Sequence, residues 1–181
     1  MAAKVIYIAG VPASGKSSLF KLLRQRLFDG ATEFKAGKVR GIKSDCGHYI
    51  MLGVFDGTTF EGTDKLSMTV IGDAIDYIDR LNGSIENHVV FVEGDRLFNY
   101  RFISETRALL LLIDANEYVL RQRHAARGDA QTDTFLKSRR SKVENFISKH
   151  KVMRIWNNTP EDQQRILSFI IKKAKEYVET V

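Results

Sequence analysis

The segment from Gly10 to Ser17 constrains this chain more than any other, because it reads G-x-x-x-x-G-K-S. It follows a short apolar run, Val5–Ala9, and leads into an amphipathic stretch from about Gly15 to Phe28. A strand, a glycine-rich turn and a helix in this order form a phosphate-binding loop, whose backbone N–H groups and helix N-terminus face the phosphates. We therefore expect the chain to bind ATP together with Mg²⁺.

Each residue type in this loop has an expected chemical role. Lys16 should reach the β- and γ-phosphates and assist catalysis, the Ser17 hydroxyl should hold Mg²⁺, and Ser18 should contact the α-phosphate. The glycines let the backbone turn its N–H groups toward phosphate oxygens. The predicted nucleotide-binding residues of the loop are Gly10, Val11, Pro12, Ala13, Ser14, Gly15, Lys16, Ser17 and Ser18.

Beyond the loop, apolar strands alternate with amphipathic helices, a pattern typical of a mostly parallel sheet covered on both faces. We predict an α/β, three-layer P-loop kinase fold, with a five-stranded sheet and a short arginine-bearing lid at about residues 121–142. We treat residues 1–181 as one domain. The core strands are expected at 5–9, 49–55, 88–92, 109–113 and 152–156, and residues 38–43 alternate like an edge strand.

The helices are expected between these strands. Asp64 is a plausible N-cap for a helix that ends at Asn82-Gly83. Thr159-Pro160 should cap and open the terminal helix, because proline suits the first helical position. The remaining predicted helices cover about residues 15–28, 117–126 and 134–148.

Glu93 and Asp95 follow the apolar run 88–92, where the acid of a Walker B strand would lie. Because parallel strands end at one edge of the sheet, we expect Glu93 to face the phosphate-binding loop. These carboxylates can hold Mg²⁺, and Glu93 can instead polarise an attacking hydroxyl. Arg96 either meets a phosphate of the substrate or pairs with one of these acids.

Asp56 is the candidate general base. It follows the buried run 49–55, so we expect it at the same edge, where it would bind the acceptor and take its hydroxyl proton. Asp45 takes that place if residues 38–43 form the inner strand instead. Asp64 is expected either to contact the substrate or only to cap its helix.

Two further segments are expected to surround the nucleotide. Arg123 and Arg127 fall on one helix face, just after Arg121, and lead into a polar loop. This pattern fits a lid that closes over the transferring phosphoryl group, with Arg127 stabilising its charge; the alternative is a solvated basic face. After the last strand, Asn158 or Thr159 either contacts the adenine or forms a turn and a helix cap.

The charge is unevenly distributed along the chain. The net charge is +6 and the pI is near 9.4, with basic segments at residues 1–28 and 121–142 and an acidic segment at 53–95. Solvated helix faces explain this pattern, and so does a basic surface for a polyanion such as DNA. Arg139, Arg140 and Lys142 are expected to be exposed charges or polyanion contacts.

Several absences agree with a cytoplasmic protein, which is our expectation. No apolar run approaches the roughly 18–20 residues that cross a membrane. Met1-Ala-Ala-Lys4 leads directly into the first strand, without the cleavage site of a secretory signal. The single cysteine, Cys46, cannot form an internal disulfide.

Three segments carry a family resemblance: Leu52-Gly-Val-Phe-Asp-Gly57, Phe60-Glu-Gly-Thr-Asp-Lys-Leu-Ser-Met68 and Val90-Phe-Val-Glu-Gly-Asp-Arg-Leu-Phe98. With the phosphate-binding loop, they resemble the bacteriophage kinases that phosphorylate 5-hydroxymethyluracil within DNA, a step in phage DNA hypermodification. The resemblance implies a primary hydroxyl on C5 of the base as acceptor, ATP as donor, DNA as partner and the host cytoplasm as location. In a duplex, the enzyme must reach into the major groove or flip the base.

Three functions therefore compete at this point. The first is a kinase for 5-hydroxymethyluracil in DNA. The second keeps the phosphoryl transfer but uses a free nucleoside or deoxynucleoside monophosphate as acceptor. The third is a nucleic-acid-binding NTPase without a phosphoryl acceptor; the chain has no guanine-reading N-K-x-D segment, which weighs against a GTPase switch.

Overall fold

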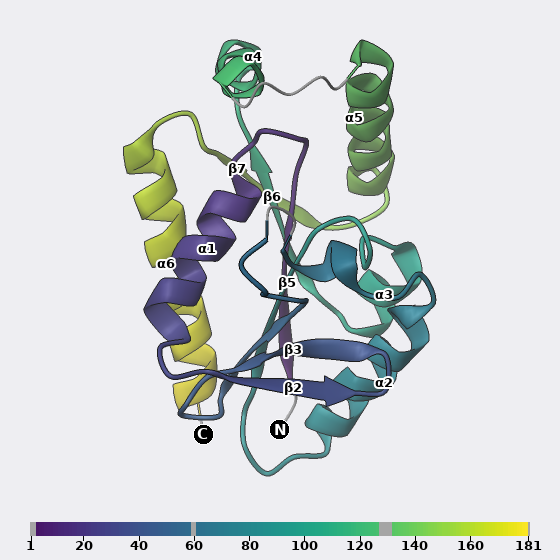
Figure 1. Cartoon of the computed structure of the whole chain (residues 1–181), viewed down its shortest axis with the longest axis vertical. Helices are drawn as coiled ribbons and strands as arrows, with labels where there is room; N and C mark the ends of the chain where they lie inside the picture. The colour runs from purple at the N-terminus through teal and green to yellow at the C-terminus, as the bar shows by residue number, and fades with distance from the viewer. Residues whose placement is uncertain (1–2, 59–60, 127–131, 181) are drawn as a thin grey trace.

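The computed structural model describes residues 3–58, 61–126 and 132–180. Its centre is a seven-stranded sheet in the order β2-β3-β4-β5-β1-β6-β7. Helices cover both faces, so the predicted three-layer α/β architecture is confirmed (Figure 1). In the part of the chain that is described, no helix combines the length and apolar composition that a membrane crossing requires.

Five of the strands run parallel, as predicted, and the other two form an added hairpin. The parallel strands are β1 (Lys4–Ala9), β4 (Tyr49–Leu52), β5 (Val89–Glu93), β6 (Leu109–Asp114) and β7 (Val152–Trp156). The hairpin joins β2 (Thr32–Ala36) to β3 (Val39–Lys43), and β3 pairs with both β2 and β4. The prediction that residues 38–43 form the edge strand is therefore wrong, because the largely exposed β2 lies outside them.

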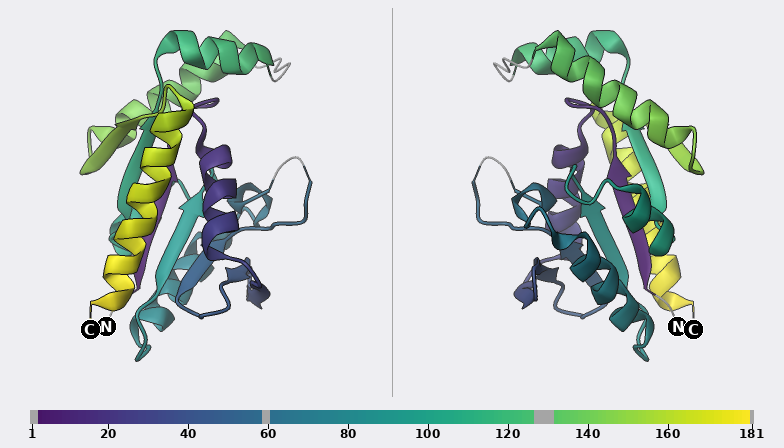
Figure 2. Two further views of the ribbon diagram at one scale, coloured as in Figure 1. Left: turned by 90° about the vertical axis from the view of Figure 1, so that its left-hand side faces the viewer. Right: turned by 90° about the vertical axis from the view of Figure 1, so that its right-hand side faces the viewer.

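The inner parallel strands β1, β4, β5 and β6 are almost wholly apolar because both of their faces are buried, whereas β7 at the edge of the sheet is partly exposed. Along β1, Val5 and Tyr7 belong to one core layer while Ile6 and Ile8 belong to the other. Alternate side chains of a strand point to opposite faces, so a continuous apolar run serves two helix layers. Figure 2 turns each of these faces to the viewer in turn.

The helices divide between the two faces and the carboxyl edge of the sheet. α1 and α6 cover one face, α2 and α3 cover the other, and α4 and α5 lie beyond the carboxyl ends of the strands (Figures 1 and 2). Thr159 caps α6 in a capping box with Asp162, as its sequence predicts. The bounds are α1 Lys16–Leu27, α2 Val70–Asn82, α3 Tyr100–Glu105, α4 Glu117–Ala126, α5 Asp133–Ile147 and α6 Pro160–Glu179.

The connection from β4 to α2 differs from the sequence-based expectation. β4 ends at Leu52, and Val54 then pairs with Gly62 in an isolated bridge. Asp64 lies in a short 3-10 helix, η1 (Thr63–Lys65), and α2 begins only at Val70. The prediction that Asp64 caps this helix is therefore wrong, because its carboxylate accepts hydrogen bonds from a different loop, described below.

Candidate active site

The phosphate-binding loop connects β1 to α1, and neighbouring atoms leave no room for a side chain at Gly10 or Gly15. A Cβ atom on Gly10 would lie 2.1 Å from the carbonyl oxygen of Ile113 on the neighbouring strand β6. Gly15 has φ +97°, and a Cβ there would lie 2.3 Å from Nδ2 of Asn157. Any larger residue at either position would therefore displace the loop from the carboxyl edge of the sheet.

Two side chains from distant segments support this loop from behind. Asn157, which follows β7 and is 1% exposed, donates a hydrogen bond of 2.8 Å to the carbonyl oxygen of Ser14. Arg123 on α4 donates to the same oxygen at 3.2 Å. The sequence pointed instead to Asn158 and Thr159, whose side-chain oxygens accept hydrogen bonds from backbone N–H groups of neighbouring turns. The signal for Asn157 is its position directly after a strand that ends at the same sheet edge.

The loop contains polar atoms that fit a phosphate ligand. Lys16 Nζ donates to the carbonyl oxygen of Val11 at 2.8 Å, which places the ammonium group over the loop. Within the described part of the chain, Ser14 Oγ and Asn157 Oδ1 are buried without a hydrogen-bond partner. Buried polar atoms are normally paired, so a hydroxyl that lacks a partner inside a glycine-lined turn fits a loop that closes on phosphate oxygens.

Glu93 ends β5 beside the loop and is only 6% exposed. Burial is the main reason why its pKa is raised to about 7; Lys16 and a hydrogen bond from the Ser17 hydroxyl oppose the shift, and Asp64 and Asp95 add to it. The Ser17 hydroxyl and the Glu93 carboxylate are therefore adjacent. Mg²⁺ at a nucleotide site typically takes only one or two oxygen ligands from the protein, and the rest from phosphates and water. The Ser17 hydroxyl and the Glu93 carboxylate fit this pattern.

This buried carboxylate predicts a pH-dependent effect on stability. An unfolded Glu93 ionises near pH 4.5, whereas the folded one ionises near pH 7, so the fold loses stability as the pH rises through this interval. In EDTA and without nucleotide, Glu93→Gln should unfold with a free energy up to about 3 kcal/mol higher than the wild type at pH 8. At pH 5 the two proteins should differ little. Urea unfolding at both pH values measures the difference, and an equal gap at both would contradict it.

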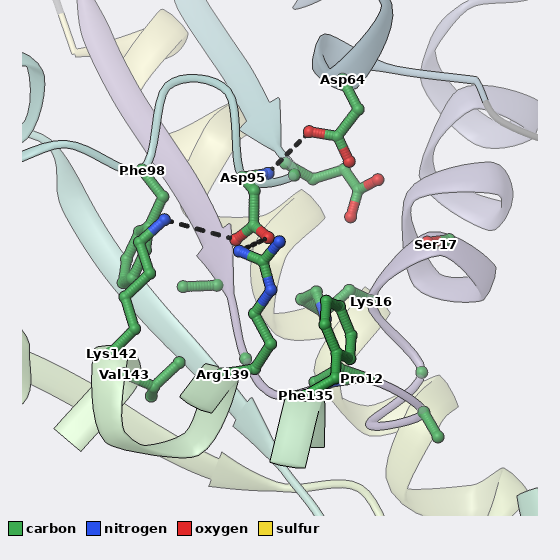
Figure 3. A pocket seen from close by; sticks show the side chains of 16 residues that line it. Pro12, Lys16, Ser17, Asp64, Asp95, Phe98, Phe135, Arg139, Lys142 and Val143 are labelled. Atoms are coloured by element: carbon green, nitrogen blue, oxygen red, sulfur yellow. Dashed lines mark hydrogen bonds and ion pairs between the residues drawn. The ribbon is translucent and has the colours of Figure 1, made fainter. Parts of the chain in front are cut away.

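Two cavities meet at this carboxylate. The first, of about 290 Å³, lies between the phosphate-binding loop and α5; the second, of about 430 Å³, lies between α1 and the β4–η1 connection. Both are lined by Ser17, Asp64 and Glu93, so these three residues mark the junction. In Figure 3, Arg139 and Lys142 extend from α5 into the first cavity, opposite Lys16.

Asp95 faces this pair of cations across the first cavity. Its carboxylate forms an ion pair with Arg139, and Lys142 Nζ lies 3.8 Å away (Figure 3). The sequence did not favour Arg139 and Lys142 as site residues, because helical spacing alone does not show which face α5 turns toward the loop. The predicted role of Asp95 as a Mg²⁺ ligand stays a prediction, since its oxygens are engaged by α5.

Asp64 is held at the junction by the loop that follows β5. Its Oδ1 accepts hydrogen bonds from the backbone N–H groups of Asp95 at 2.8 Å and Arg96 at 3.1 Å. In return, the Arg96 guanidinium donates to the carbonyl oxygen of Asp64 at 2.9 Å and contacts Met68 Sδ. Arg96 therefore fixes the position of η1 in this structure and does not line either cavity.

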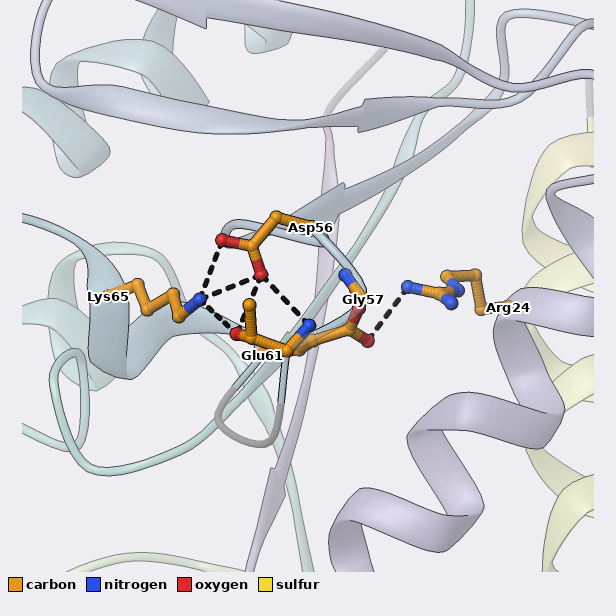
Figure 4. A network of polar contacts seen from close by, with 6 residues as sticks. Arg24, Asp56, Gly57, Glu61 and Lys65 are labelled. Carbon is orange, nitrogen blue, oxygen red and sulfur yellow. Dashed lines mark hydrogen bonds and ion pairs between the residues drawn. The ribbon is translucent and has the colours of Figure 1, made fainter.

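Asp56 does not face the phosphates, contrary to the expectation from sequence. β4 ends four residues earlier, and the chain carries Asp56 outward, where Lys65 Nζ lies 2.6 Å from Oδ2 (Figure 4). Hydrogen bonds from Lys65 and Thr58 lower the pKa of Asp56 to about 2, and its side chain is 44% exposed. The alternative acid, Asp45, follows β3, which runs antiparallel to β4, so it lies at the opposite edge of the sheet.

The second cavity has its own polar and aromatic lining. Glu61 accepts a hydrogen bond from Gly57 N at 2.7 Å and pairs with Arg24 of α1 at 2.9 Å (Figure 4). The rings of Phe20 and Phe55 lie 6.2 Å apart, and the Arg24 guanidinium lies 5.4 Å from the centre of the Phe55 ring. The lining of the cavity therefore combines two aromatic rings with charged groups.

The predicted lid is described only in part. Arg121 is 79% exposed and pairs with Glu117 at 2.6 Å, so its side chain lies on a solvated face. Arg123 contacts the phosphate-binding loop, as given above, while Arg127 lies outside the described residues. The catalytic role of Arg127 therefore stays a prediction.

Comparisons with known proteins agree with this geometry. A family model described as P-loop Nucleotide Kinase3 matches residues 1–171. No curated protein matches the chain. A gluconokinase from Sinorhizobium meliloti 1021 is similar in structure, with a TM-score of 0.51 and 14% identity over 96% of this chain and 94% of that one. An unliganded sugar kinase from Janibacter sp. HTCC2649 gives 0.51 and 12% over 93% and 95%. At these identities the likeness concerns the fold alone.

Proposed function

The chain belongs to the family described as P-loop Nucleotide Kinase3, and we propose that it transfers the γ-phosphate of ATP to the 5-hydroxymethyl group of 5-hydroxymethyluracil in DNA. One observation carries the transfer itself: Asp64 and Glu93 stand at the junction of two cavities, one beside the phosphate-binding loop and one with an aromatic wall. This arrangement lets the phosphate donor and the hydroxyl acceptor meet beside a carboxylate that can act as the general base.

The donor is assigned to the first cavity. The loop from Gly10 to Ser18 would bind the phosphates of ATP, with Arg123 supporting it from α4. Ser17 and Glu93 would hold Mg²⁺, which supplies neutralising charge at the β- and γ-phosphates. Lys16 and Arg139 place positive charge around the group in transfer, and the predicted lid arginine, Arg127, would add to it.

The acceptor is assigned to the second cavity, which is large enough to admit a single nucleobase. A pyrimidine can lie against Phe55 and Phe20, with Arg24 and Glu61 as hydrogen-bonding partners. We assign the general base to Asp64, because it lines both cavities while two backbone N–H groups fix its orientation. The hydroxyl proton passes to Asp64, the hydroxyl oxygen bonds to the γ-phosphorus, and the bond to the β-phosphate oxygen breaks to release ADP.

The choice of a DNA base as acceptor rests on the resemblance of two segments, 60–68 and 90–98. The contact between Asp64 and the backbone of Asp95 and Arg96 brings these segments together at the junction. The net charge of +6 agrees with a polyanionic substrate. To unstack a base from DNA costs a few kcal/mol of free energy. Contacts between the base and an aromatic ring such as that of Phe55 can offset this cost.

Incubation with γ-labelled ATP tests the acceptor. We expect label in DNA that contains 5-hydroxymethyluracil, none in matched DNA with thymine, and a rate that falls steeply with salt as counterions are released. Label confined to a free nucleoside or nucleoside monophosphate, with little effect of salt, would establish the small-molecule kinase instead. Hydrolysis of ATP without any labelled acceptor would indicate an NTPase.

A further inference from the structure

A surface groove is lined by Tyr100 of α3, by residues of α5 and by the segment that follows α5. Figure 1 shows the C-terminal end of α5 near α3. The groove has a volume of about 800 Å³, and its lining includes three rings, those of Tyr100, Phe146 and His150, and two lysines, Lys142 and Lys149. Lys142 also lines the first cavity, so the groove begins beside the candidate active site.

The rings form a continuous row from that site to the surface. Phe98, which lines the first cavity, lies 4.3 Å from the Phe146 ring, and Phe146 stacks on His150 at 4.4 Å with an angle of 14°. His150 lies 4.9 Å from Tyr100, whose side chain is 61% exposed. An exposed tyrosine at the end of such a row presents a face on which a further ring can stack.

The charge of the groove favours an anion. No carboxylate occurs among the described residues that line it, whereas Lys142 and Lys149 do. Hydrogen-bonding groups are supplied by Ser138, Ser141 and Asn145 of α5. Cations and aromatic faces along one track are the combination that proteins use to bind single-stranded nucleic acid, with phosphates on the cations and bases on the rings.

We propose that this groove binds a single-stranded stretch of the DNA substrate, away from the acceptor base. One base stacks on the exposed ring of Tyr100, and the phosphates of the strand lie near Lys142 and Lys149. This inference rests on the proposed function, because a strand whose acceptor base occupies the second cavity must continue along the protein surface. The groove shares Lys142 with the first cavity and carries both cations and an exposed ring, which suits it to a more distant part of that strand.

Two variants with matched controls test the groove. Tyr100→Ala should weaken the binding of a labelled single-stranded oligonucleotide of about 12 thymidines at least fivefold. Lys149→Glu should also weaken oligonucleotide binding, and it should reduce the steepness with which log affinity falls with log salt concentration by about one. Tyr118→Ala on α4, where the tyrosine is 69% exposed, and Lys172→Glu on α6, where the lysine is 76% exposed, make the same changes elsewhere and should leave binding unchanged. Fluorescence anisotropy measures the affinity, and ATP affinity should stay the same in all four variants.

The outcomes separate this inference from the proposed function. If Tyr100→Ala, Tyr118→Ala and the wild type bind the oligonucleotide equally well, the proposal that the groove binds DNA is wrong. This holds even if 5-hydroxymethyluracil in DNA is phosphorylated. Affinity that depends on Tyr100, while label enters only free nucleosides, would support the groove as a DNA-binding surface and overturn the DNA base as acceptor. Lost ATP affinity in Tyr100→Ala would also count against the groove, because it would mean that the fold had changed.

Discussion

Lys16→Ala should reduce the rate of phosphoryl transfer by about 10³-fold and leave the protein folded. The ammonium group lies over the phosphate-binding loop, where it donates a hydrogen bond of 2.8 Å to the carbonyl oxygen of Val11. Its removal takes away positive charge at the point where the β–γ bond breaks, whereas the loss of one hydrogen bond costs the fold only about 1 kcal/mol. The effect on kcat should therefore far exceed the effect on the melting temperature.

Steady-state kinetics and a thermal melt of the same samples measure both quantities. Lys35→Ala is the matched control, because Lys35 is exposed on β2, at the edge of the sheet that lies away from the loop. A Lys16→Ala enzyme that keeps a tenth or more of the wild-type rate would show that the loop does not bind the transferring phosphates.

Asp64→Asn should lower kcat by about 10²- to 10⁴-fold, the usual contribution of a general base, while Asp56→Asn should change it less than tenfold. An asparagine oxygen can still accept the hydrogen bonds from Asp95 N and Arg96 N, so the junction keeps its shape. Asp56 is paired with Lys65 at the surface, and an exposed pair contributes little to stability or to the site.

The pair of variants decides between the two acids. A large loss of kcat in Asp56→Asn with near-normal rates in Asp64→Asn would return the base to Asp56 and imply that the β4–η1 connection rearranges when substrate binds. Melting temperatures of both variants within a few degrees of the wild type would show that the comparison reports chemistry and not unfolding.

The parts of the fold that follow from local patterns were predictable. The strands β1, β5 and β6 are short apolar runs that both core layers require, and the loop from Gly10 to Ser17 has a fixed geometry. β2 was missed because it lies at the edge, where an exposed, polar sequence carries no burial pattern. α3 was missed because six residues are too few to show a helical period.

The site was less predictable because its details depend on contacts between distant segments. Glu93 could be placed from the end of its strand, since parallel strands share one edge. Asp56 could not, because the end of β4 is set by a bridge between Val54 and Gly62 that no local pattern reveals. The approach of α5, which brings Arg139 to Asp95, likewise depends on packing between segments far apart in the chain.

The hydrogen bond from Asn157 to the carbonyl oxygen of Ser14 spans 143 positions of the chain. The motif that begins near the N-terminus is therefore completed by a residue that reaches it only after β7 has paired with β6 and α6 has packed beside α1. During synthesis, a ribosome-bound chain carries the full phosphate-binding sequence long before it carries the site. Tight nucleotide binding should consequently appear late in folding, as a property of the finished sheet.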